Sequence, residues 1–186
     1  MRIISGLFKG KKIFEPKDLK TRPLKDLTKE SIFNIINHSN KLQININKAN
    51  ILDIFSGVGS FGLECLSREA KYVTFIENYK NVLSILKKNL LNLKKIKNYK
   101  VIEKNAFESN TYKKLNDKFD IIFLDPPYKE KNIEEIFNNI LSQNVLNDNG
   151  VIILHRHKKT KDTFPSKFKV LEEKKYGISK IIFISL

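Results

Sequence analysis

The run Asp125-Pro126-Pro127-Tyr128 places an acid, two rigid residues and an aromatic ring directly after an apolar segment that ends at Leu124. Prolines fix their own φ angles and hold the preceding residue in extended geometry, so this turn presents its carbonyl groups in set directions. Methylation of a planar amino group needs such a turn. The lone pair of that nitrogen is delocalised, and acceptors for its two N–H groups direct the lone pair at an electrophilic methyl group.

The predicted catalytic segment is therefore Asp125, Pro126, Pro127 and Tyr128. We expect the Asp125 carboxylate and the Pro126 carbonyl to accept one N–H each, and Tyr128 to stack on the base that carries the amino group. The sequence holds no Cys and His cluster at metal-ligand spacing, so no metal is expected. The alternative interpretation is an ordinary loop, in which proline ends a strand and Tyr128 covers its end.

The elements that must position this segment follow a regular pattern from residue 48 onward. Apolar, β-branched runs alternate there with helical patterns, at residues 51–55, 72–76, 99–102, 120–124 and 151–154. Near-continuous apolar strands are covered on both faces, and right-handed crossovers join parallel strands, so we expect a doubly wound parallel α/β sheet. Two more strands, 167–172 and 180–185, predict a closing antiparallel hairpin that turns through Tyr176-Gly177-Ile178.

Residues 1–47 look different from the rest of the chain. Two apolar runs on either side of the turn Ser5–Gly10 predict a small β-hairpin. A helix follows, for which Asp26 is the predicted N-cap and His38-Ser39-Asn40 the stop. Its predicted apolar face consists of Leu27, Ile32, Phe33, Ile35 and Ile36. We divide the chain into an N-terminal extension, residues 1–47, and a main domain, residues 48–186.

Residues that could hold a nucleoside follow the first three strands, at the sheet edge where open α/β sheets bind ligands. Gly57 and Gly59 allow a sharp turn and a close backbone approach, and the helix that starts near Ser60 directs N–H groups into the same crevice. Glu77 ends the second strand, where its carboxylate could accept both ribose hydroxyls. Asn105-Ala106 follows the third strand and suits an adenine contact, although a plain surface turn explains Asn105 equally well.

Two rival interpretations come from other classes of protein. The residues Gly57–Gly62 also satisfy the GxGxxG pattern of a dinucleotide-binding oxidoreductase, and Glu77 would serve NAD(P) as well as S-adenosylmethionine. The short chain shows no hydride-substrate pocket, which argues against that class. The other rival is a non-catalytic RNA-binding or assembly factor of the same fold, for which loss of the Asp125 carboxylate would change nothing.

The charge of the chain favours a polyanionic partner. Its 186 residues carry 35 Lys+Arg against 20 Asp+Glu, a net charge of +15, although codon bias in an A+T-rich genome is an equal explanation for the many lysines. No membrane span or signal segment is present, so we expect a cytoplasmic monomer without membrane contact, and Cys65 is expected to be a buried structural thiol. Charge placement predicts RNA contacts from Arg2, Lys9, Lys11, Lys12, Arg22 and Lys25.

The run Asp125–Tyr128 resembles the [D/N]PP[Y/F] signature of methyltransferases that act on amino groups of nucleic-acid bases. Further matches extend over nearly the whole chain, at Met1–Gly6, Gly10–Lys12, Thr21–Pro23, Lys29–Ile35, Leu52–Gly57, Gly62–Glu64 and Tyr176–Gly177. Together they resemble the RsmD family of bacterial 16S rRNA guanine-N2 methyltransferases.

The resemblance implies a Rossmann-like class I methyltransferase fold, with a seven-stranded, mostly parallel sheet. It also implies S-adenosyl-L-methionine as methyl donor, and a specific guanine of 16S rRNA within a small-subunit particle as target. Adenine-N6 methylation of DNA or RNA is the alternative, because that amino group suits the same acceptors. The cofactor-binding residues that we predict are Asp53, Phe55, Ser56, Gly57, Gly59, Glu77, Asn78, Asn105, Ala106 and Asp125.

The sequence departs from the family pattern at three places. Asn105 stands where the family usually has Asp, and Leu27 where an Arg is common. The segment Leu154-His155-Arg156-His157 replaces an acidic residue after the fifth strand. Methyl transfer from a sulfonium needs no strong base beforehand, so we predict no catalytic role for His155 and His157 and expect a solvated or RNA-facing loop there.

Overall fold

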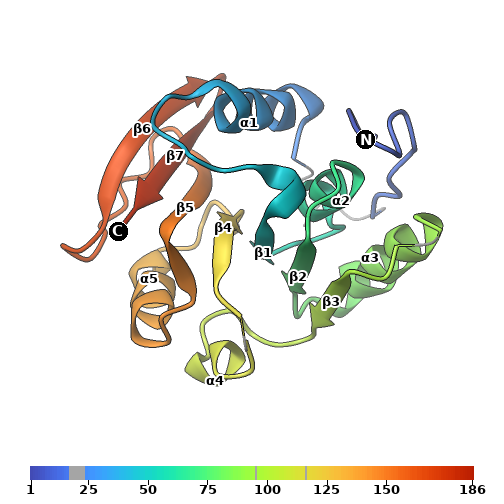
Figure 1. Cartoon of the computed structure of the whole chain (residues 1–186). Coiled ribbons are helices and arrows are strands. Elements are labelled where there is room, and N and C mark those ends of the chain that lie inside the picture. The colour runs from blue at the N-terminus through green and yellow to red at the C-terminus, as the bar shows by residue number, and fades with distance from the viewer. Residues whose placement is uncertain (17–23, 95, 116) are drawn as a thin grey trace.

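The computed structural model describes residues 1–16, 24–94, 96–115 and 117–186. It confirms an α/β architecture in which helices cover both faces of one seven-stranded sheet (Figure 1). The strands are β1 Asn50–Ile54, β2 Tyr72–Ile76, β3 Tyr99–Ile102, β4 Phe119–Leu124, β5 Leu146–His157, β6 Lys169–Tyr176 and β7 Ser179–Ser185. The helices are α1 Asp26–His38, the 3₁₀ turn η1 Ile46–Lys48, α2 Ser60–Ser67, α3 Lys80–Asn92, α4 Ser109–Tyr112 and α5 Ile133–Ser142.

The order of the strands is β3-β2-β1-β4-β5-β7-β6. The five central strands pair in parallel, and β7 pairs antiparallel with both β5 and β6, which confirms the predicted closing hairpin. The order reverses between β1 and β4, so the chain leaves these two neighbours in opposite directions. Open sheets bind ligands at such a switch point, beyond the carboxyl ends of the strands.

Two apolar cores lie on the two faces of the sheet, because successive side chains of a strand point to opposite faces. Ile51 of β1 and Phe123 of β4 belong to the core under α1, α2 and α3. Leu52 of β1 and Leu124 of β4 belong to the core under α4 and α5. Figure 1 shows α1 and α2 on the opposite side of the sheet from α4 and α5. Cys65 is buried in the first core, as predicted.

The predicted N-terminal hairpin is present as two short antiparallel arms, in which the Ile3 N–H donates to the Lys11 carbonyl at 2.9 Å and the Ile13 N–H to the Met1 carbonyl at 3.0 Å. The two arms run antiparallel, but only Arg2 and Lys12 form a ladder bridge. Other backbone groups of the arms bond to the main domain. The N–H groups of Ile4 and Ser5 donate to the Glu64 carboxylate at 2.7 and 2.9 Å, and the Phe14 N–H donates to Asn89 Oδ1 at 2.8 Å. The extension is thereby fastened to α2 and α3.

Helix α1 buries Ile32, Phe33 and Ile36 of the predicted face, and Ile35 packs against the same core, but the prediction for Leu27 is wrong. Leu27 is 78% exposed, whereas Lys29 is fully buried beside Ile32 and Phe33. The Lys29 ammonium donates to the Arg2 carbonyl at 2.7 Å and lies 3.7 Å from Glu64. Burial lowers the pKa of Lys29, and the charge of Glu64 opposes that shift. A charged residue is therefore accommodated in the interior by a partner on α2.

The predicted N-cap of α1 is also wrong. Asp26 is the first helical residue, Lys25 occupies the cap position, and no side chain caps the helix there. The Asp26 carboxylate instead lies 3.7 Å from the Lys29 ammonium and 4.0 Å from the Arg2 guanidinium. The helix ends at His38, as predicted. None of the helices in the described ranges is long and apolar enough to cross a membrane.

Candidate active site

The turn after β1 is shaped by residues in the left-handed region of backbone conformation. Phe55, Gly57 and Gly59 have φ angles of +59°, +56° and +86°. A Cβ atom on Gly59 would lie 2.5 Å from Cδ1 of Leu86, so α3 packs directly on this glycine. Helix α2 begins at the next residue, Ser60, and its first N–H groups point back towards the turn. The sequence therefore predicted this turn for the right reason.

Two carboxylates accept hydrogen bonds from the backbone of this turn and of the segments beside it. Asp53 accepts the Gly62 N–H at 3.0 Å, and Glu77 accepts the N–H groups of Gly57, Asn78 and Tyr79 at 2.8 Å each. Both side chains are buried. Burial raises the pKa of Asp53 well above its ordinary value, and the charges of Asp125 and Glu77 raise it further against the opposing Gly62 hydrogen bond. This end of the site therefore favours a ligand with cationic or hydroxyl groups.

A cavity of about 730 Å³ opens where these turns meet the loop after β4. Most of the predicted cofactor and catalytic residues line it: Asp53, Phe55, Ser56, Gly57, Glu77, Asn78, Asn105, Asp125, Pro126, Pro127 and Tyr128. Gly59 and Ala106 are not in the lining. Gly59 supports the turn beneath α3, and Ala106 is buried in the second core, where its carbonyl accepts the Tyr112 hydroxyl at 2.7 Å.

Sequence reasoning missed most of the apolar wall of the cavity. That wall includes Leu24, Val58, Phe61, Val82, Phe107 and Phe123. Leu24 is notable because it belongs to the extension, which therefore closes one side of the cavity. The sequence pattern does not mark these residues, since an apolar residue that packs in a core cannot be distinguished by its neighbours in sequence from one that faces a ligand. The missed polar residues are Ser60, Tyr79, Lys129 and Glu130.

Asn105 forms a local turn and also lines the cavity, the two alternatives that the sequence left open. Its side-chain oxygen accepts the Phe107 N–H at 3.1 Å, and its carbonyl accepts the Thr111 hydroxyl at 2.7 Å, so it forms a local turn. It also lines the cavity. Since the turn uses the side-chain oxygen, the amide NH₂ is the group that remains for a ligand.

The predicted loop at His155–His157 is wrong, because all three residues belong to β5. Strand β7 extends β5 to this point, with His157 opposite Ser179. His155 is 2% exposed, and its Nδ1 lies 2.8 Å from Oδ1 of Asp125, whose side chain is 19% exposed. The rings of His157 and His155 meet the Tyr128 ring edge-on, with centroids 5.2 and 6.1 Å away. The histidines thus contact the predicted catalytic segment directly.

Arg156 is fully buried on the other face of β5 and holds the same loop. Its guanidinium donates to the carbonyls of Pro127 at 3.3 Å and Glu130 at 2.6 Å, and Nε donates to Asp162 at 2.9 Å. A sequence signal existed for this cluster. Asp125 and His155 each follow the apolar run of neighbouring parallel strands by one residue, and the carboxyl ends of such strands meet at one edge.

The basic residues predicted to meet RNA lie on the extension at differing exposure. Arg2, Lys9, Lys12 and Lys25 are exposed. Lys11 is half-buried, and its ammonium donates to the Asn92 carbonyl at the end of α3 and lies 5.5 Å from the centroid of the Phe8 ring. Arg22 lies outside the described residues.

Comparison with known proteins agrees with this geometry. Residues 1–185 match the family model described as Conserved hypothetical protein 95. The chain is 35% identical over 179 residues to the ribosomal RNA small subunit methyltransferase D of Haemophilus influenzae, covering 96% of this chain and 90% of that protein. The Escherichia coli protein of the same name is 37% identical over 150 residues, which cover 81% of this chain and 68% of that one. The chain belongs to the RsmD family.

Solved structures agree with the assignment to the RsmD family. A chain from Escherichia coli described as a methyltransferase superposes with a TM-score of 0.83 at 30% identity, covering 99% of this chain and 96% of that one. A methylase from Haemophilus influenzae superposes with a TM-score of 0.76 at 34% identity, covering 98% and 96%. The predicted Rossmann-like methyltransferase fold is confirmed.

The three places where this RsmD family member departs from the expected pattern have different environments. Leu27 is exposed at the start of α1, and Asn105 lines the cavity. His155 stands beside the Asp125 carboxylate. The third departure is therefore the one that touches the predicted catalytic segment.

Proposed function

We propose that the protein transfers a methyl group from S-adenosyl-L-methionine to the exocyclic N2 of a guanine in 16S rRNA. The proposal rests on one observation above the others. The Asp125 carboxylate lines the cavity with one oxygen already engaged by His155, and its other oxygen, Oδ2, accepts no hydrogen bond from a described residue. That oxygen is the acceptor that an amino group would use. Membership of the RsmD family supports the same reaction.

The cavity fits the methyl donor in size and in the kinds of groups that it presents. About 730 Å³ is within the usual range for a cofactor of this size, and the wall combines aromatic rings with a few buried carboxylates. Glu77, at the end of β2, would accept a ribose hydroxyl beside its three backbone N–H donors, and Asn105 with Phe107 would border the adenine. The buried Asp53 would attract the cationic amino and sulfonium groups.

The donor, when bound, supplies an electrophilic methyl group, and the chain's own residues supply the alignment of the nucleophile. Asp125 Oδ2 and the Pro126 carbonyl would each accept one N–H of the guanine amino group, which directs the nitrogen lone pair at the methyl carbon. Tyr128 would stack on the base, held edge-on by the rings of His155 and His157. The amino proton leaves after the nitrogen becomes cationic, so Asp125 acts first as an acceptor.

The proposed RNA substrate would also contact the N-terminal extension. Arg2, Lys9, Lys12 and Lys25 would contact phosphates, whereas Lys11 is already partly engaged by Asn92. We propose that residues 1–47 form a separate RNA-contacting part, although their buried residues share a core with the main domain. Because the proposed substrate is ribosomal RNA, we propose that the protein acts in the cytoplasm, as a monomer on a small-subunit particle.

The test is transfer of labelled methyl to small-subunit RNA and particles that lack the modification, followed by identification of the nucleoside. We expect N2-methylguanosine with the wild-type protein and a rate about 10²-fold lower with Asp125→Ala, by analogy with other lost preorganised polar groups. Asp148→Ala is the matched control, because that carboxylate is 98% exposed and remote from the cavity lining.

Each alternative has a distinct result in this assay. N6-methyladenine as the only product would refute the guanine assignment but keep the reaction class. Saturable donor binding without transfer to any RNA or DNA would point to a non-catalytic assembly factor. Equal rates for Asp125→Ala and Asp148→Ala would remove Asp125 from the mechanism.

A further inference from the structure

The loops after β4 and β5 carry exposed lysines next to the predicted catalytic segment. Lys129 and Lys131 follow Tyr128, while Lys158, Lys159 and Lys161 follow His157. All five are exposed, and none of their ammonium groups forms an ion pair with a residue in the described part of the chain. We call these five residues the loop lysines. Lys129 also lines the cavity, and the other four lie in the same two loops.

Acidic residues in the same loops do not neutralise the loop lysines. The Asp162 carboxylate is buried and paired with Arg156 at 2.9 Å. The Glu130 carboxylate accepts the N–H groups of Lys131 and Asn132 at 2.8 Å each, so it is turned to its own backbone. The exposed charge of both loops is therefore carried by lysine.

Arg156 fixes the two loops relative to each other and to Tyr128. Its guanidinium donates to two carbonyls of the β4 loop and to the Asp162 carboxylate of the β5 loop. The Lys159 N–H donates at 3.2 Å to Nδ1 of His157, whose ring touches Tyr128. In long flexible loops the lysines would occupy many positions, whereas here the buried Arg156 side chain restrains both loops. The loop lysines are thus a fixed feature of the edge at which a base would enter.

We propose that the loop lysines bind the RNA phosphates on either side of the target nucleotide. The assignment rests on the proposed function. A base can reach a buried methyl donor only if it leaves its stack, and the phosphates that flank it then stay outside the cavity. Phosphate contacts position a nucleic acid without reading its sequence, which suits mobile ammonium groups. The loop lysines would form a second RNA-binding surface besides the extension. In the extension, Lys11 lies by the end of α3, remote from the cavity.

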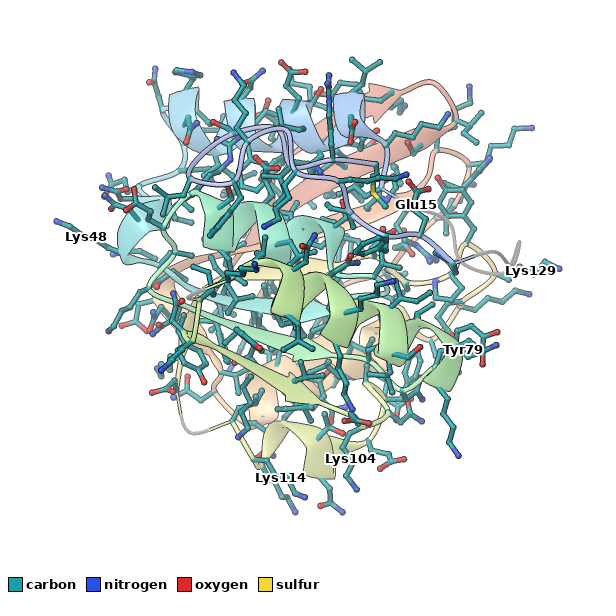
Figure 2. The ribbon with its side chains drawn as sticks, turned by 90° about the vertical axis from the view of Figure 1, so that its right-hand side faces the viewer. Glu15, Lys48, Tyr79, Lys104, Lys114 and Lys129 are labelled. Carbon is teal, nitrogen blue, oxygen red and sulfur yellow. The ribbon has the colours of Figure 1, made fainter. Side chains whose placement is uncertain are left out.

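The position of the cavity opening supports this choice. Lys129 and Tyr79 both line the cavity, and Figure 2 shows them projecting at the same edge of the molecule. Lys48 projects at the opposite edge in the same view. It precedes β1, as Lys71 precedes β2 and Lys97 precedes β3, so these three exposed lysines mark the amino ends of the strands. They provide a control that removes equal charge from the far side.

The experiment compares two triple variants with the wild-type protein. One carries Lys131→Gln, Lys159→Gln and Lys161→Gln, and the control carries Lys48→Gln, Lys71→Gln and Lys97→Gln. Binding to unmodified small-subunit particles is measured from low to moderate salt. Each phosphate contact contributes about 0.7 to the slope of log K against log salt for single-stranded nucleic acid, so the loop variant should lose about 2 in slope. The control should keep the wild-type slope.

A KM measurement and donor binding complete the design. The loop variant should raise KM for the particle while kcat and donor affinity remain at the wild-type level, since none of its three positions lines the cavity. An unchanged slope, or an equal loss in both triple variants, would overturn the assignment of the loop lysines. A wild-type protein that transfers no methyl to RNA would instead overturn the proposed function, and the assignment with it.

Discussion

The contact between His155 and Asp125 makes a sharp prediction for His155→Leu. Leucine fills similar space but removes the donor 2.8 Å from Asp125 Oδ1. Hydrogen bonds to charged groups contribute about 1.5–3 kcal/mol, and the strand-borne ring allows the carboxylate little rotation while the bond is present. If that bond orients Oδ2 for the amino group, its loss lowers kcat by about 10- to 10²-fold.

The assay is single-turnover methyl transfer at saturating donor and RNA, with His155→Asn as the conservative variant. An Asn amide nitrogen can replace Nδ1 as donor to Asp125, so His155→Asn should recover most of the rate. Donor affinity should not change in either variant, because backbone N–H groups of the turn after β1 and of α2, and not His155, hold the Glu77 and Asp53 carboxylates. His38→Asn, at the exposed end of α1, is the control for histidine replacement.

Two results would refute this reasoning. A full rate for His155→Leu would show that Asp125 needs no orienting donor. Equal loss in His155→Leu and His155→Asn, at equal melting temperatures, would show that the ring itself matters and the hydrogen bond does not. Either result leaves the role of Asp125 in place, since that role is tested separately by Asp125→Ala.

Two further predictions concern buried charge. Burial raises the pKa of Asp53 above its ordinary 3.8, so this carboxyl holds a proton more tightly in the folded state than in the unfolded state. The contribution of Asp53 to the free energy of unfolding therefore falls as the pH rises from 3.8 through the pKa of the folded state. Asp53→Asn should therefore raise the free energy of unfolding by an amount that grows with pH, while it weakens donor binding; parallel pH profiles in urea unfolding would contradict this. Lys29→Met removes one of two cationic partners of Glu64, which keeps Arg68 at 2.9 Å, so it should destabilise the protein by about 1–3 kcal/mol, with partial recovery on adding Glu64→Gln. An unchanged urea midpoint for the single variant would count against the pair.

Much of the fold was predictable because its signals are local. The apolar runs that became β1, β2, β3 and β4 are within one residue of the observed strands. The turn at Gly57 and Gly59 was predictable for the same reason, since positive φ is a property of single residues. The signature at Asp125 depends on consecutive residues as well.

The errors all occurred where a distant partner decides the outcome. Leu27 was assigned to the interior of α1 and Lys29 was not, because the partner of Lys29 is Glu64 on another helix. The attachment of the extension to α2 and α3 was not predictable, because the acceptors are the distant side chains of Glu64 and Asn89. Strand β5 continued through polar residues because β7 pairs with it that far.

By itself, the sequence determined the order of the elements, the sharp turn after β1 and the chemistry of the Asp125–Tyr128 segment, because each depends on residues adjacent in the chain. Only the tertiary structure decided that His155 engages the Asp125 carboxylate and that Arg156 anchors the loops that carry the loop lysines. Those contacts join residues about thirty positions apart, and they exist because parallel pairing of β4 and β5 brings their carboxyl ends to one edge.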